Sequence, residues 1–197
     1  ADNILRNFGM PHPEGYRKIL RMFSQAEKFN RPVINLIDTQ GAYPGMGAEE
    51  RGQAWCISQA LMVLSHLKVP VISIVTGEGG SGGALALAVA DRLLMLSNAV
   101  FSIASAEACA SILWKDVKRV EESAQAMRIT AQDLYQLGIV DEIIEEPIGG
   151  AQEAFIEAAR GIKESIGNIL AEILEKDRSE LLAERYNKLR KIGIFNE

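Results

Sequence analysis

The chain has 197 residues, of which 48% are hydrophobic and 24% charged, and its formal net charge is −5. This composition is typical of a globular domain with a real core, and the negative charge argues against sequence-independent nucleic-acid binding. Gly, Asp and Ser interrupt the longest apolar runs well before the ~20 residues that a membrane helix needs. Two cysteines form neither a metal-spaced pair nor a disulfide framework, which favours a reducing, cytoplasmic location.

The first part of the chain predicts two helix–strand pairs. Apolar side chains fall on one face over residues 14–29, which indicates a helix, and the run at 32–38 indicates a buried strand. Residues 48–67 predict a second helix and residues 69–76 a second strand. The loop at 39–47 lies between these pairs, at the carboxyl end of a strand, where ligands bind in α/β folds.

Four side chains near these elements are candidates for chemistry. Tyr43 offers its ring or hydroxyl to a ligand, or packs under its own loop, and the sequence favours neither. Asp38 is a possible general base, although an Asp at a strand end more often ties its own turn. His12 is expected to be a solvated loop residue, and His66 a surface residue stabilised by a helix C-terminus.

Residues 77–83, with the sequence GEGGSGG, stand between the second strand and a helix predicted at 84–90. The first N–H groups of a helix lack intrahelical partners and carry the positive end of the dipole. Glycines let a substrate oxygen approach that backbone closely. The stretch is therefore interpreted as an oxyanion hole formed by the N–H groups of Gly82 and Gly83, or as close packing of the helix on the sheet.

Two other motifs overlap the same glycines. Residues 77–82 have the dinucleotide-binding spacing, but no acidic residue ends the next predicted strand. Residues 79–83 have the spacing of a hydrolase nucleophile elbow, with Ser81 as nucleophile, but both histidines precede this serine. A Ser–Lys pair with Lys115 or Lys118 leaves a hydrolase or peptidase as the alternative function.

The rest of the chain continues the alternation of strands and helices, which predicts an α/β fold with a mostly parallel or spiral sheet. Glu107 is a possible acid or base, but a helix-dipole partner is favoured. After residue 151, apolar residues from Phe155 to Ile173 recur at spacings of four and three and predict an amphipathic helix, followed by a charged helical tail at 172–190. The remaining expected elements are strands at 92–96, 100–104 and 140–145, and helices at 105–114, 116–127 and 130–137.

Six motifs together resemble one known family: NFGMP at 7–11, PEGYRK at 13–18, DTQGAYPG at 38–45, GAEERGQ at 47–53, GEGGSGGALA at 77–86 and CASILWK at 109–115. The chain is similar, over essentially its whole length, to carboxyltransferase alpha subunits of bacterial-type acetyl-CoA carboxylase. Gln40 departs from the proline expected there, which implies a less rigid loop. The family also has a longer, largely helical N-terminal region, so residues are expected to be missing upstream.

The resemblance implies a crotonase-like spiral of ββα units over 1–150 and a helical tail over 151–197 that packs on the domain or a partner. It implies transfer of a carboxyl group from carboxybiotin, on the biotin carboxyl carrier protein, to acetyl-CoA, giving malonyl-CoA for fatty acid synthesis. The expected partners are a zinc-ribbon-bearing beta subunit, in an α2β2 assembly, and biotin carboxylase. No metal is expected on this chain.

The same resemblance assigns the site. The reaction develops oxyanions on the biotin carbonyl and on the thioester, and each needs preorganised donors but no histidine or cysteine. Gly82 and Gly83 are expected to supply the donors, serving the biotin carbonyl in preference to the thioester. The residues expected to shape the biotin side of the cleft are Gly79, Gly80, Gly41, Ala42 and Tyr43.

Overall fold

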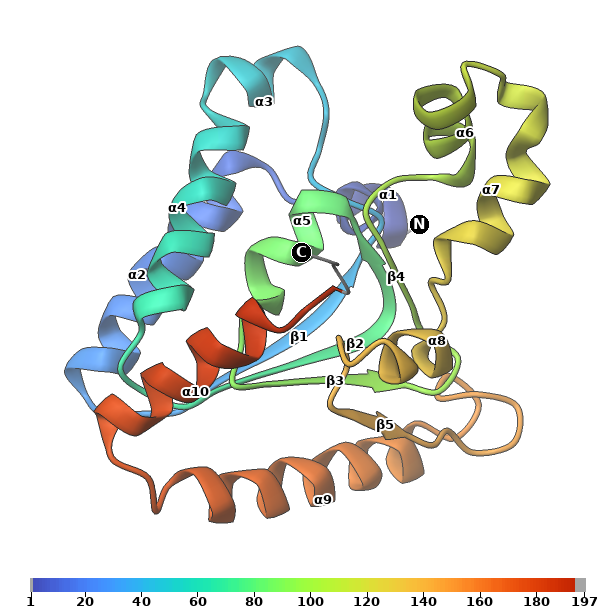
Figure 1. Ribbon diagram of the computed structural model, residues 1–197. Coiled ribbons are helices and arrows are strands. Elements are labelled where there is room, and N and C mark those ends of the chain that lie inside the picture. Colours follow the sequence, from blue (N-terminus) through green and yellow to red (C-terminus); the bar gives the residue numbers. More distant parts are fainter. Residues whose placement is uncertain (1, 194–197) are drawn as a thin grey trace, which may run out of the picture.

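The computed structural model describes residues 2–193 as an α/β fold around one parallel sheet (Figure 1). Neighbouring strands follow the order β1-β2-β3-β5, and β4 pairs with the far end of β2. The strands are β1 (Val33–Thr39), β2 (Val71–Gly80), β3 (Arg92–Leu96), β4 (Val100–Ser102) and β5 (Glu142–Ile144).

The helices surround this sheet. In Figure 1, α2 and α4 lie side by side, α5 crosses near the sheet, and α6 and α7 stand together away from the other helices. The helices are α1 (Asp2–Leu5), α2 (Pro13–Lys28), α3 (Met46–Glu50), α4 (Gln53–His66), α5 (Ser81–Ala88), α6 (Ala106–Trp114), α7 (Val120–Met127), α8 (Ala131–Gln136), α9 (Phe155–Ile173) and α10 (Arg178–Arg190), with 3₁₀ turns at Asn7–Gly9 and Val117–Arg119.

The second strand, β2, is the centre of the molecule. Its first five residues, Val71 to Val75, are all fully buried, because β1 and β3 pair on its two sides and helices cover it. The neighbouring strand β1 instead alternates buried and exposed residues. The sequence predicts a buried strand at 32–38, but β1 is buried on one face only, so that prediction is wrong for its other face. The second strand, predicted at 69–76, is the one whose first residues are buried on both faces.

The glycine stretch is where the predicted boundaries are wrong. The strand β2 continues through Gly77 to Gly80, and helix α5 begins at Ser81 and ends at Ala88. The extension forms because β4 adds a parallel ladder there, pairing Glu78 with Val100 and Gly80 with Ser102. Hydrogen bonding to a neighbouring strand thus overrides the low strand propensity of glycine.

Three predicted helices differ in detail. The helix expected at 48–67 is divided into α3 and α4, because Gly52 adopts a left-handed conformation with φ +80°. The helix expected at 116–127 starts as a 3₁₀ turn. The C-terminal tail also breaks, since the Asp177 side chain accepts hydrogen bonds from the N–H groups of Ser179 and Glu180 and starts α10 as a new helix.

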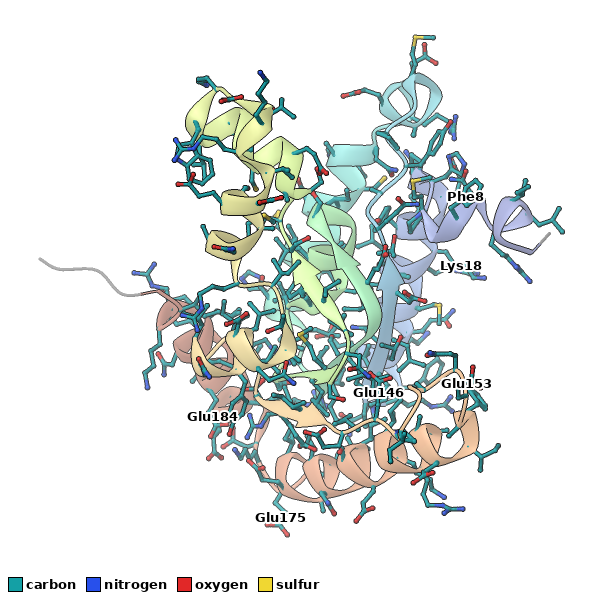
Figure 2. The ribbon with its side chains drawn as sticks, turned by 90° about the vertical axis from the view of Figure 1, so that its right-hand side faces the viewer. Phe8, Lys18, Glu146, Glu153, Glu175 and Glu184 are labelled. Carbon is teal, nitrogen blue, oxygen red and sulfur yellow. The ribbon has the colours of Figure 1, made fainter. Side chains whose placement is uncertain are left out.

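The C-terminal helices pack on the rest of the domain. Ile169, Ile173 and Leu181 are buried in the main apolar cluster with residues of β3 and β5. Phe155, by contrast, is 71% exposed, so the predicted apolar seam is correct for the second half of α9 but not for its start. The loop before α9 contains Glu146, which is labelled in Figure 2. The Glu146 carboxylate accepts from the N–H groups of Asn98 and Ala151 at 3.0 and 2.8 Å, and these bonds hold the loop.

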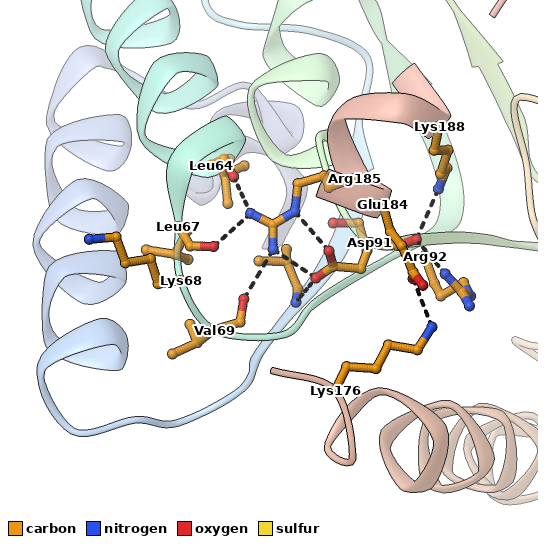
Figure 3. Close-up of polar contacts among 12 residues, drawn as sticks. Leu64, Leu67, Lys68, Val69, Asp91, Arg92, Lys176, Glu184, Arg185 and Lys188 are labelled. Atoms are coloured by element: carbon orange, nitrogen blue, oxygen red, sulfur yellow. Dashed lines mark hydrogen bonds and ion pairs between the residues drawn. The ribbon is translucent and has the colours of Figure 1, made fainter. Parts of the chain in front are cut away.

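A buried ion pair holds α10 in place (Figure 3). The Arg185 guanidinium donates to both carboxylate oxygens of Asp91, at 2.9 and 2.8 Å. It also donates to the carbonyl oxygens of Leu64 and Leu67, both at 2.7 Å, and of Val69 at 3.1 Å. Because both charged side chains are at most 3% exposed, this bidentate pair connects α10 to the end of α4 and the start of β3 through a fully desolvated contact.

Candidate functional site

The turn between β2 and α5 is formed by a single change of direction at Gly80 and Ser81. Gly80 is extended, and Ser81 adopts a left-handed conformation with φ +52° before the helix begins. The N–H groups of Ser81, Gly82 and Gly83 are the first three of α5 and have no intrahelical acceptor. This places three amides, and the positive end of the helix dipole, directly after the central strand.

Two of the glycines are closely packed. A Cβ on Gly80 would overlap the carbonyl oxygen of Gln40, and one on Gly83 would overlap the amide nitrogen of Ala42. The loop after β1 therefore lies directly against the start of α5. At Gly82 the situation differs, since a Cβ there would meet only the Ile57 side chain at an ordinary 3.7 Å. Close packing explains Gly80 and Gly83, while Gly82 has room.

Two hollows meet at Ser81. The first, about 510 Å³, is lined by Gly82 and by mostly apolar side chains from β4, α6, α7 and α8, including Phe101, Cys109 and Met127. The second, about 290 Å³, is more polar and is lined by Gly79, Gly80 and Ser81 together with residues of the β4 region. A ligand lying across Ser81 would contact both hollows and the start of α5.

The structure brings the predicted site residues together in part. Gly79 and Gly80 line the polar hollow, and Gly82 lines the apolar one, whereas Gly83 is buried and lines neither. Gly41, Ala42 and Tyr43 line neither of these two hollows; the loop that they form lies behind Gly80 and Gly83. Tyr43 is half-buried, with its ring 4.5 Å from that of His12. His12 is therefore not the solvated loop residue expected, because its ring is packed and its Nδ1 is buried.

The other polar candidates have structural roles. Asp38 ties the neighbouring strand, not its own turn as expected, because its carboxylate accepts from the N–H of Glu78 at 3.0 Å. Glu107 lies in the first turn of α6, where hydrogen bonds from its own N–H and from Ser105 lower its carboxyl pKa, as favoured for a dipole partner. His66 is exposed at the end of α4, as expected.

The hydrolase alternative has the backbone it needs but lacks a base. The left-handed Ser81 between a strand and a helix is the geometry of a nucleophile elbow. Within residues 2–193, however, its hydroxyl makes no hydrogen bond, and Lys115 and Lys118 are exposed around the end of α6. A serine without an adjacent base is a weak nucleophile, so the geometry favours use of the amides over use of the hydroxyl.

Sequence reasoning missed two residues that shape this region. Tyr16 of α2 is 2% exposed and donates from its hydroxyl to the carbonyl oxygen of Gly83 at 3.3 Å, and burial raises its pKa to about 12. Gln53, the first residue of α4, holds the loop around Tyr43 through its side chain. For Tyr16 the available signal was its place on the apolar face of the helix expected at 14–29, because a hydroxyl buried there needs a hydrogen-bond partner.

Neither a metal site nor a membrane helix is found in the described part of the chain. No three His, Cys, Asp or Glu side chains gather closely enough there to hold a metal ion. Among the helices of residues 2–193, none combines the length and the apolar character required to cross a bilayer.

Comparison with solved structures shows that the chain shares its fold with transcarboxylase 12S and with a malonate decarboxylase. A crystal structure of transcarboxylase 12S matches with a TM-score of 0.72 at 22% identity, covering 85% of this chain and 32% of that chain. A Pseudomonas malonate decarboxylase hetero-tetramer in complex with coenzyme A matches with a TM-score of 0.69 at 20% identity, covering 86% and 70%. At these identities the likeness concerns the fold, and the crotonase-like prediction is confirmed.

Sequence comparison places the chain more closely. The family model described as acetyl co-enzyme A carboxylase carboxyltransferase-like matches residues 1–193, and the chain belongs to that family. It is 71% identical over 194 residues to an acetyl-coenzyme A carboxylase carboxyl transferase subunit alpha of Syntrophomonas wolfei, covering 98% of this chain and 61% of that protein. The protein of the same name from Clostridium botulinum is 60% identical over 194 residues, covering 98% of this chain and 71% of that protein. The chain thus spans about two thirds of the length of such relatives.

Proposed function

We propose that this chain is the alpha half of a biotin-dependent carboxyltransferase that transfers a carboxyl group from carboxybiotin to acetyl-CoA, giving malonyl-CoA, in the cytoplasm. The observation that carries the proposal is the position of the Gly82 amide. It lies at the start of α5, next to the central strand, and opens on a hollow large enough for a small ring system. Amides so placed stabilise a developing oxyanion without any titrating side chain.

The residues present fit biotin. Gly82 has no side chain between its amide and the hollow, and apolar side chains line most of that hollow, as a fused-ring ligand with few polar atoms requires. When bound, carboxybiotin supplies the carboxyl group that is transferred, and its ureido oxygen gains negative charge as that group leaves. The N–H groups of Gly82 and Gly83 would donate to this oxygen, and Gly79 and Gly80 would shape the approach from the polar hollow.

In this proposal the residues of this chain hold hydrogen-bond donors in position and transfer no proton themselves. The two amides are held in place before reaction, since Gly83 packs on Ala42 and its carbonyl accepts from Tyr16. Donors that need no reorganisation are worth about 3–4 kcal/mol each in the transition state. Once a partner subunit covers the larger hollow, its apolar lining would exclude water and strengthen these hydrogen bonds.

The second half of the reaction needs a partner. In this proposal the acetyl thioester is held mainly by a zinc-ribbon-bearing beta subunit, in an α2β2 assembly, and the carrier protein, loaded by biotin carboxylase, brings the biotin. The name of the relatives, subunit alpha, supports an enzyme of more than one subunit. The exposed apolar side chains around the larger hollow, such as Ile103 and Leu113 at 80% and 66% exposed, are suited to burial at a subunit contact.

The test uses the chain mixed with purified beta subunit. Malonyl-CoA-dependent carboxylation of biocytin, the reverse reaction, is expected for the mixture and for neither subunit alone. Gly82→Val should lower kcat by about a hundredfold or more, because the added branch displaces or covers one donor. The control is Gly167→Val in α9, where a Cβ meets nothing within 4 Å. An undiminished rate for Gly82→Val would refute the role of this amide.

A further inference from the structure

Gln53 makes contacts that the proposed reaction does not yet use. It is the first residue of α4, and only 9% of its surface is exposed. Its Nε2 donates to the carbonyl oxygen of Pro11 at 2.8 Å and to that of Tyr43 at 2.9 Å. The N–H of Tyr43 also donates to the Pro11 oxygen, at 3.0 Å. These hydrogen bonds connect Gln53, Pro11 and Tyr43 in a closed triangle. The triangle joins the segment before α2, the loop after β1 and the start of α4.

The triangle holds the loop at its middle residue. Both main-chain polar groups of Tyr43 are used in it, and the Tyr43 ring packs on His12, the residue next to Pro11. At the other end of the loop, the Thr39 hydroxyl accepts from the N–H of Gly41 at 3.1 Å and donates to its carbonyl oxygen at 2.9 Å. Between these two anchors lie the residues that touch the glycines of the site.

The loop after β1 is in tight backbone contact with Gly80 and Gly83. The backbone of Gln40 occupies the place that a Cβ of Gly80 would take, and the backbone of Gly41 and Ala42 does the same for Gly83. A loop that moved toward or away from α5 would therefore either overlap these glycines or leave them without support. Because protein interiors are close-packed, one side chain cannot take up such a shift by changing its own conformation. The displacement of the loop would therefore also move the amides at the start of α5.

The Gln53 side chain is buried at a cost. Its Oε1 is buried and makes no hydrogen bond within the described residues. An unsatisfied buried acceptor of this kind costs about 1–3 kcal/mol. A side chain of similar length without polar atoms would avoid this cost. We infer that the two hydrogen bonds donated by the Gln53 amide group, which hold the loop, offset the cost of the unsatisfied oxygen.

We propose that Gln53 is a positioning residue: its amide group sets the position of the loop at 40–43, and through that loop the position of the Gly82 and Gly83 amides. Gln53 touches neither of the two hollows and acts through main-chain atoms only. The catalytic part of the inference rests on the proposed carboxyltransferase function, whereas the mechanical part stands without it.

The first measurement tests the mechanical part by amide hydrogen exchange on the purified chain. Gln53→Met keeps the length of the side chain and removes both donors, and Gln59→Met, on the same helix at a half-buried residue, is the matched control. Faster exchange is expected in segments 40–45 and 80–84 of the Gln53 variant, with the β3 segment 92–96 unchanged. If Gln53→Met fails to fold, Gln53→Glu, which removes both donors above its carboxyl pKa, is measured in its place.

The second measurement is biocytin carboxylation by the chain assembled with the beta subunit. The Gln53 variant should lower kcat about tenfold and leave both KM values within about twofold, because the misplaced donors act in the transition state. Unchanged exchange at 40–45, a uniform rise over the whole chain, or raised KM values at wild-type kcat would each overturn the proposal. An inactive wild-type assembly with the local exchange change present would instead count against the proposed function alone.

Discussion

At the scale of single residues, neighbouring glycines in the motif GEGGSGG differ in how closely the rest of the protein packs against them. Gly80 and Gly83 leave space for the backbone of the loop after β1, whereas Gly82 has only the Ile57 side chain at contact distance. Of the two interpretations of the stretch drawn from the sequence, close packing therefore applies to Gly80 and Gly83, and the proposed oxyanion hole uses the amides of Gly82 and Gly83, so both apply at Gly83 and only the second at Gly82. Substitution can separate them.

We predict opposite effects of alanine at adjacent positions. Gly83→Ala should lower the free energy of unfolding by about 1–3 kcal/mol or more, because its methyl group overlaps the main chain of Ala42. Gly82→Ala should leave it unchanged or raise it by up to about 1 kcal/mol, since alanine favours the helix. Urea unfolding of both variants decides the matter. Equal losses at the two positions would mean that Gly82 is packed as closely as Gly83.

A second residue-scale prediction concerns acid stability. Arg51 donates to the Glu14 carboxylate at 2.8 Å, and this contact lowers the Glu14 pKa from 4.5 to about 2. Since the folded-state pKa is the lower one, the unfolded chain binds more protons, and the stabilisation is present above pH 4.5 and lost as the pH falls toward 2. The difference in unfolding free energy between the wild type and Glu14→Gln should shrink over that range. A difference that stays constant between pH 6 and 3 would contradict the assignment.

At the scale of elements, the structure depends on contacts that connect distant segments. The strand β2 is longer than its apolar run because β4 pairs with its glycines, and that extension carries the turn to the level of the loop after β1. At the opposite end of the strands, α10 is attached by Arg185. One set of contacts places the site, and the other closes the core beneath it.

The Arg185 attachment gives a third prediction. Arg185→Ala should lower the free energy of unfolding by about 3–5 kcal/mol, because it leaves the Asp91 carboxylate buried without its partner. Arg190→Ala, on the same helix and exposed, should change it by less than about 0.5 kcal/mol. Chemical denaturation followed by circular dichroism measures both. A loss of only about 1 kcal/mol for Arg185→Ala would show that water reaches Asp91 once the guanidinium is removed.

At the scale of the whole molecule, the sequence predicts the order of elements better than their ends. Apolar periodicity predicts β1, β2, α2 and the second half of α9, because these elements bury one face or both in the core. The extension of β2 and the break at Gly52 depend on a partner strand and on a left-handed turn, which local patterns do not show. Site residues were predicted from the motifs, but the support given by Gln53 and Tyr16 comes from segments that meet only in the fold.

The division of the chain at residue 150 gives the last prediction. The side chains of Ile169, Ile173 and Leu181 are buried against β3 and β5, and each such burial contributes about 1.5–3 kcal/mol. Their sum is a large share of the about 5–15 kcal/mol that stabilises a whole domain. A chain ending at residue 150 should therefore show no cooperative urea transition, whereas one ending at residue 191 should unfold close to the full-length midpoint. Cooperative unfolding of residues 1–150 alone would establish that the core is complete without α9 and α10, and that these helices are an appendage.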